Sequence, residues 1–247
     1  MTSLPEQDLP AGHALFARYA FPPNELGYCG PAETSMLHGG GPPQLASFAK
    51  EFDGAWPYMR AIADAVGSTD PLDAEVVRSY WVGGPPLDKV DSTELLARLR
   101  KAFTGQVTGL LGDLPATAQA LAHHSFHVFV VYPWVGFLDR DPTTPLRVMQ
   151  DCRIRWGTVE SVDAQHAVIT SRPLTFVAGV LALGDPLAER VRWSKDGASL
   201  APAPAPGDTV SAHWDWLCGT LSDAEAAALL IATQTTLDLV NSARNRS

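Results

Sequence analysis

The sequence is poor in basic residues and has no long apolar run. In 247 residues, 18 Lys and Arg stand against 27 Asp and Glu, which gives a formal net charge of -9. A protein that binds a nucleic-acid duplex needs clustered Lys and Arg to displace the counterions of the phosphates. The longest apolar runs, at 128–131 and 226–232, are far shorter than the roughly 18 residues of a membrane span. The sequence therefore predicts no nucleic-acid partner and no membrane span.

Cysteine is also scarce. Cys29, Cys152 and Cys218 are an odd number at wide spacing, which is a poor disulfide framework and suits a reducing compartment. The segment 1–8 has no basic stretch followed by an apolar one, so a secretory signal is not expected. We therefore expect a cytoplasmic protein whose free thiols can act as metal ligands or nucleophiles.

Helical patterns dominate the first half of the chain. Apolar residues recur at intervals of three and four in 45–52, 59–66 and 75–81, as on the buried face of a helix. Asp91-Ser-Thr-Glu94 has the form of a capping box, and Gly- and Pro-rich stretches separate the predicted helices. The sequence predicts an irregular helical domain over residues 1–145.

The second half changes to short strands. Residues 127–132 fit a buried strand or a short helix, and the segment that begins at Cys152 alternates apolar and polar residues, as a half-buried strand does. Further short strands are predicted at 167–171, 174–183, 189–193 and 209–214. A capping box at Ser222 and Glu225 begins a helix to about Asn241. The predicted class is α+β, with a small OB-like barrel and a C-terminal helix over residues 146–247.

Four motifs follow one another in this second half. They are a strand that opens with Cys152, the continuation Gly157-Thr-Val-Glu-Ser-Val-Asp, the segment Pro206-Gly-Asp-Thr-Val-Ser-Ala-His213, and Leu221-Ser-Asp-Ala-Glu before the last helix. This order resembles the HypC/HupF-type maturation chaperones of nickel-iron hydrogenases. The resemblance covers roughly residues 151–243.

The resemblance implies a function and two site residues. In that family a leading cysteine on the first barrel strand, with a strand histidine nearby, carries an iron centre with cyanide and carbon monoxide ligands. The matching positions are Cys152 and His213. The implied partners are the hydrogenase large subunit and a HypD-like iron-loading scaffold. The chain departs from the family pattern because Cys152 is internal and has no free α-amino group, and because the loop 170–207 is longer.

The residue types agree with that role. A thiolate is a soft ligand that suits low-spin ferrous iron, and a neutral imidazole at His213 could ligate iron or bond to its cyanide. The alternative is structural, since a strand cysteine is often a small buried apolar residue and a strand histidine can simply be hydrogen-bonded at the barrel rim. We interpret Cys218 as a packing residue.

The first half contains an alternative site. Cys29-Gly-Pro-Ala-Glu at an expected helix start would have a lowered thiol pKa. It resembles the Cys-Gly-Pro-Ala start of some papain-like cysteine peptidases, for which His127 and Asp141 would be the other two members of the catalytic set. The alternative hypothesis is therefore a papain-like cysteine hydrolase.

A second set of candidate ligands lies in the histidine-rich segment. His123 and His127 are four residues apart, and this spacing places two imidazoles on one face of a helix. Together with Cys29 they form a weaker set of candidate metal ligands. The structural alternative is a histidine cluster, including His124, that lines a seam between two domains.

The whole chain is also similar to an uncharacterised actinobacterial family, through Tyr28-Cys-Gly-Pro, His123-His-Ser-Phe-His and Val210-Ser-Ala-His-Trp. The function that these patterns favour is an accessory protein of hydrogenase maturation, closer to a metal-centre chaperone than to an enzyme. An interaction module with no chemistry at any of these sites is the third hypothesis.

Overall fold

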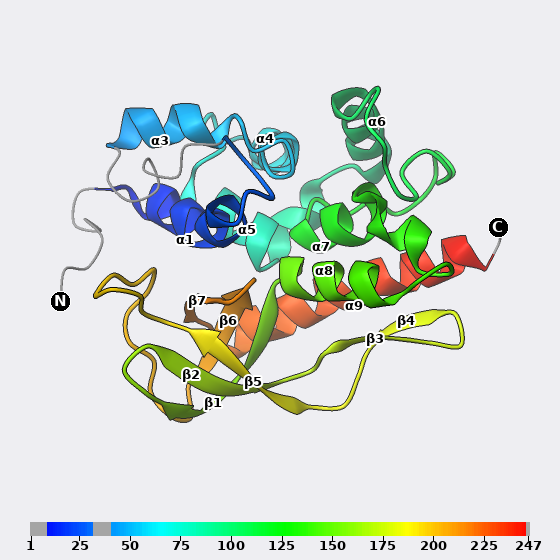
Figure 1. Ribbon diagram of the computed structural model, residues 1–247. Helices are drawn as coiled ribbons and strands as arrows, with labels where there is room; N and C mark the ends of the chain where they lie inside the picture. Colours follow the sequence, from blue (N-terminus) through cyan, green and yellow to red (C-terminus); the bar gives the residue numbers. More distant parts are fainter. Residues whose placement is uncertain (1–8, 32–40, 246–247) are drawn as a thin grey trace.

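A computed structural model describes residues 9–31 and 41–245 of the chain, and it places the helices of the first half above a barrel (Figure 1). The helical elements are α1 Ala11–Glu25, α3 Pro42–Ala49, α4 Trp56–Val66, α5 Ala74–Trp81, η1 Pro85–Lys89, α6 Ser92–Ala102, α7 His124–Phe126, η2 His127–Val131, η3 Pro133–Phe137 and α8 Thr143–Cys152. Residues 127–131 are thus helical, the second of the two structures that the sequence allowed.

Short polar caps set the limits of several helices. Asp73 accepts a hydrogen bond from the Glu75 amide at the start of α5, and Asp91 accepts one from the Glu94 amide at the start of α6. Such caps satisfy amides that have no partner inside the helix. Gly67 ends α4 with a φ of 74°, a conformation that favours glycine.

The second half forms the barrel. Its strands are β1 Arg155–Val162, β2 His166–Ser171, β5 Leu187–Arg192, β6 Thr209–His213 and β7 Trp216–Thr220, and they close in the order β1-β2-β5-β7-β6. All neighbours are antiparallel except β5 and β7, which close the barrel through one parallel pair. A separate hairpin, β3 Leu174–Val177 with β4 Val180–Leu183, interrupts the barrel between β2 and β5.

Three local expectations are corrected. Cys152 does not begin a strand, because it is the last residue of α8 and β1 begins only at Arg155. The single strand expected at 174–183 is the β3–β4 hairpin, which turns at Gly179 with a φ of 80°. Strand β7 is not among the strands that the sequence predicts. Gly219 has a φ of 155° and lies within the strand.

The last helix ties the halves together. α9 spans Asp223–Arg244, begins with the complete capping box of Ser222 and Glu225, and contacts α7, η2 and β4. The larger apolar core includes residues of both halves, from Phe16 to Val240. The domain boundary predicted after residue 145 falls inside α8.

The predicted class is confirmed: the chain is α+β, with a helical first part, a closed five-stranded barrel and a C-terminal helix. Within residues 9–31 and 41–245, none of the helices has both the length and the apolar character needed to cross a bilayer.

Candidate metal site

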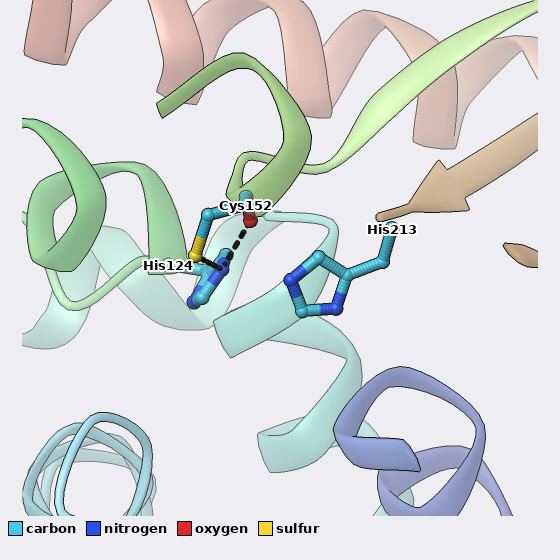
Figure 2. Close-up of side chains that lie close together, drawn as sticks. All are labelled: His124, Cys152 and His213. Carbon is cyan, nitrogen blue, oxygen red and sulfur yellow. Dashed lines mark hydrogen bonds between the residues drawn. The ribbon is translucent and has the colours of Figure 1, made fainter. Parts of the chain in front are cut away.

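Three ligand-type side chains meet where the helices contact the barrel. His124 comes from the start of α7, Cys152 from the end of α8, and His213 from the end of β6. One ligand atom of each lies within 4.8 Å of the other two, and all three residues are buried. Figure 2 shows the thiol and the carbonyl of Cys152 facing the His124 ring, with the His213 ring beside them. We call these three residues the His-Cys cluster.

A buried arginine holds two of the three chain segments together. Arg155 donates hydrogen bonds to the carbonyls of Asp151 and Trp214, the neighbours of Cys152 and His213. Its guanidinium also pairs with Glu189 at 3.0 Å, and the Trp214 amide donates to the Asp151 carbonyl at 2.8 Å. The end of α8 is therefore fixed against the end of β6.

His213 presents a free nitrogen to the cluster. Its Nδ1 lies 2.7 Å from the carbonyl oxygen of Tyr19 in α1, so that Nδ1 carries the proton and donates it. Nε2 is then a lone-pair nitrogen, and it is fully buried with no hydrogen-bond partner among the described residues. A histidine that ligates a metal usually donates the N–H of its other ring nitrogen to a carbonyl or a carboxylate, and this hydrogen bond fixes its tautomer.

The hydrogen-bond contacts around His124 need one more proton than the groups in them can supply. The Tyr80 hydroxyl donates to the carbonyl of Gly54 at 2.5 Å and lies 2.9 Å from His124 Nδ1, while His124 Nε2 lies 2.8 Å from the Cys152 carbonyl. These three contacts need three protons, but Tyr80 and a neutral His124 supply two. One contact is therefore left without a proton, and with the His124 proton on Nδ1 it is the contact between the Nε2 lone pair and the Cys152 carbonyl. A cation at Nε2 would relieve this conflict.

Burial determines the protonation of the cluster. It lowers the pKa of His124 to about 4 and that of His213 well below the usual range. It raises the pKa of the Cys152 thiol well above its usual range, with the charges of Cys29 and Asp151 adding to the effect. At neutral pH both imidazoles are therefore neutral and the thiol is protonated. The arginines near Cys152 do not lower its pKa.

The dimensions suit a single metal ion. The centre of a triangle with 4.8 Å sides lies about 2.8 Å from each corner, and bonds from a metal of the zinc type to nitrogen and sulfur are about 2.0–2.3 Å. Each ligand would move by about half an ångström. The cavity that the cluster lines has a volume of about 20 Å³, enough for one water or one ion.

Cys29 lines the same cavity but makes a different contact. It lies in the irregular segment after α1, and its Sγ is 2.8 Å from the Tyr132 hydroxyl. Burial raises the pKa of this thiol, rather than lowering it as a helix start would. The helix expected after Cys29 lies largely on residues 32–40, outside the described residues.

The other members of the proposed hydrolase set lie apart from each other. His127 is buried, lies 3.4 Å from the Tyr58 hydroxyl, and packs against Gly54, where a Cβ atom would come within 2.8 Å of the imidazole. Asp141 is exposed and accepts a hydrogen bond from the Thr143 amide at the start of α8. In the described part of the chain no hydrogen bond joins Asp141 to His127, so the carboxylate does not orient that imidazole.

His123 takes a structural role. Its Nδ1 accepts a hydrogen bond from the Ser125 amide and so caps α7. The structure groups His124, and not His123 or His127, with Cys152. No pattern in the sequence predicts this choice, because it depends on the backbone: His123 is extended and His124 is helical, so their side chains point to different places.

A surface depression of about 420 Å³ lies beside the cluster, lined by Asp151 and Trp214, which adjoin two of its residues in the chain. Trp214 turns the chain between β6 and β7 with a φ of 52°, a strained conformation for a bulky residue. Its ring stacks on Tyr28 at a centroid distance of 4.1 Å. Both rings of this stacked pair line the depression.

The chain belongs to a family of unknown function, DUF6390, whose model matches residues 8–247. No curated protein and no solved structure matches it.

Proposed function

We propose that this protein binds a transition-metal ion, with iron as the ion it handles, at His124, Cys152 and His213. The observation that carries the proposal is the meeting of three buried ligand atoms within 4.8 Å of one another, one of them an orphaned imidazole nitrogen. One thiolate and two imidazoles favour iron, zinc, cobalt or copper over magnesium or calcium. Binding would convert the Cys152 thiol to a thiolate and leave the two imidazoles neutral.

The finer part of the proposal is a role in nickel-iron hydrogenase maturation. Two elements that the HypC/HupF resemblance implies are present, since the Gly207-Asp208 motif leads into β6 with His213 at its end, and the capping-box helix α9 follows β7. The cargo would be iron with cyanide and carbon monoxide ligands, handed between a HypD-like scaffold and the hydrogenase large subunit in the cytoplasm. A cavity of about 20 Å³ has no room for the diatomic ligands. The cargo would therefore require this cavity to widen.

Infrared spectroscopy tests the cargo directly. The protein is produced together with the maturation machinery and purified without oxygen, as wild type and as Cys152→Ala and Cys218→Ala. Cys218 is a matched control, because it is equally buried but lies on β7 outside the cluster. We expect bands of iron-bound cyanide and carbon monoxide in the wild type and in Cys218→Ala, and their loss in Cys152→Ala. Bands that persist in Cys152→Ala would contradict the assignment of the ligand.

A parallel titration separates the ion from its cargo. Ferrous iron added without oxygen to protein produced alone should bind in a one-to-one ratio, and the affinity should fall at least about a hundredfold in His213→Ala, as for loss of a ligand or its support. Binding without infrared bands would retain the metal site and overturn the hydrogenase role. Absence of iron binding would overturn the metal site itself.

A further inference from the structure

A second depression, of about 390 Å³, opens on the barrel where β1 runs between β2 and β6. Gly157 forms part of its lining and has no side chain to fill it. A Cβ atom at Gly157 would lie 2.3 Å from the Thr170 carbonyl, so the close approach of β1 and β2 requires glycine here. The depression is thus a product of the strand register.

A buried cation lines this depression. Arg153 is 2 % exposed, and no carboxylate of the described residues pairs with it. Its Nε donates to the Gln150 side chain and its Nη2 to the Arg172 carbonyl, which leaves Nη1 without a protein acceptor among the described residues. An arginine side chain keeps its proton in proteins, so this guanidinium is a cation. The Glu189 carboxylate acts on Arg153 electrostatically but pairs with Arg155, so the buried Arg153 charge has no ion-pair partner of its own among the described residues.

A second arginine, Arg172, also lines this depression. Arg172 is exposed and donates through Nε and Nη2 to the carbonyls of Gly184 and Leu183, and it too has no carboxylate partner in the described part of the chain. The chain has more acidic than basic residues, yet two arginines without an ion-pair partner among the described residues line this one depression.

The hydroxyls around the depression divide into two kinds. Those of Thr170 and Ser171 already donate to the carboxylates of Glu160 and Glu189. Those of Thr158 and Thr209, which face each other across β1 and β6, make no hydrogen bond within the described residues. Two cationic donors and two free hydroxyls remain available to one guest.

We infer that this depression is a binding site for a phosphate group, either free phosphate or the phosphate of a small monoester. Two guanidinium charges match the charge of about -1.5 to -2 that a phosphate group carries at neutral pH. A single carboxylate would leave one of the two charges without a partner. The inference does not rest on the metal site, so either one can fail without the other.

The test is calorimetric titration of the full chain with inorganic phosphate, methyl phosphate and acetate at constant ionic strength. We expect saturable binding of both phosphates with a ratio of one, and binding of acetate weaker by about tenfold or more. Tighter binding of methyl phosphate than of inorganic phosphate would identify a monoester as the guest, and the reverse would identify the free anion. Acetate that binds as tightly as phosphate would overturn the assignment of a dianion.

Variants locate the site. Arg172→Ala removes an exposed side chain and should weaken phosphate binding at least about tenfold, and Arg153→Lys, which keeps the buried charge, should weaken it as well. Arg60→Ala on the exposed side of α4 removes the same charge elsewhere and should leave the affinity unchanged. Thermal unfolding without phosphate checks that each variant is folded. No saturable binding, or unchanged binding in Arg172→Ala, would overturn the inference.

Discussion

The interior of the barrel and the seam between the barrel and the helices are both buried, yet they have opposite chemistry. The barrel core is built from hydrophobic side chains such as Val159, Ile169 and Val191. The seam holds His124, Cys152 and His213, which are as fully buried. Burial of apolar carbon stabilises the fold, whereas burial of ionisable groups works against it. The barrel interior therefore accounts for stability, and the proposed metal site is our explanation for the seam.

One strand serves both regions. On β6, Val210 and Ala212 belong to the apolar core of the barrel, while Ser211 and His213 bond to the hydroxyl and the carbonyl of Tyr19 in α1. Successive side chains of a strand point to opposite faces. A strand that is buried on both faces can thus support the fold on one side and the His-Cys cluster on the other.

The largest difference between the regions should appear in acid. Burial lowers the pKa of His123 and His127 to about 3 and that of His124 to about 4, whereas an unfolded histidine titrates near 6.5. Between pH 6.5 and 4 the unfolded state binds more protons, so stability is complete above pH 6.5 and falls as the pH decreases. Each such histidine contributes a slope of about 1.4 kcal/mol per pH unit. Chemical denaturation of the metal-free protein at a series of pH values measures this.

The variant His127→Phe tests the source of that slope. It removes one titrating group from the seam and leaves the barrel unchanged, so the slope should become shallower by about 1.4 kcal/mol per pH unit. An unchanged slope would place the titration outside the seam.

Truncation of a side chain in the barrel core should have the next largest effect. It should lower the stability of the fold without changing the affinity for iron. Ile169 is fully buried in the barrel core, and Ile169→Ala should lower the free energy of unfolding by about 2–5 kcal/mol. Iron affinity, measured where the variant is still folded, should not change. If Ile169→Ala lowered both the stability and the iron affinity, the barrel core and the seam would not be independent.

Metal binding should release one proton. The Cys152 thiol is protonated and both imidazoles are neutral at neutral pH, so only the thiol must lose a proton. Affinity should therefore rise about tenfold per pH unit near neutrality, equivalent to about 1.4 kcal/mol. Calorimetry in buffers with different ionisation enthalpies counts the protons. If metal binding released no proton, Cys152 would not bind the ion as a thiolate.

The smallest effect concerns access to the seam. Tyr28 is 43 % exposed and stacks on Trp214, so Tyr28→Ala should speed the uptake and release of the ion several-fold and leave its equilibrium affinity nearly unchanged. Stopped-flow mixing with Co²⁺ provides both rate constants. Equal rates in variant and wild type would show that the ion enters by another route.

Local patterns predicted the parts of this fold that depend on local physics. The period-two alternation from Cys152 onward and the capping box of Ser222 and Glu225 are properties of a few neighbouring residues. The capping box is present at the start of α9, and the alternation corresponds to β1, although that strand begins only at Arg155. The extent of α8 was not predictable in this way. Cys152 belongs to that helix because its neighbours Asp151 and Arg155 bond to residues of the β6–β7 turn, some 60 positions later in the chain.

The candidate site was predictable only in part. The motifs indicated Cys152 and His213, and the structure brings these two together. The third member, His124, could not be chosen from its neighbours His123 and His127, because the choice depends on Tyr80 and on the end of α8. The orphaned Nε2 of His213 likewise depends on Tyr19, which lies 194 positions earlier in the chain.

The central claim is that the His-Cys cluster binds a metal ion through the Cys152 thiolate. The most direct measurement is the absorption spectrum of the protein with one equivalent of Co²⁺, in which a thiolate ligand produces an intense sulfur-to-metal charge-transfer band. The spectrum is compared for the wild type and for Cys29→Ser, Cys152→Ser and Cys218→Ser. Our account predicts that the band disappears in Cys152→Ser and remains in the other two. A band that survives in Cys152→Ser, or that is lost in Cys29→Ser, would contradict it.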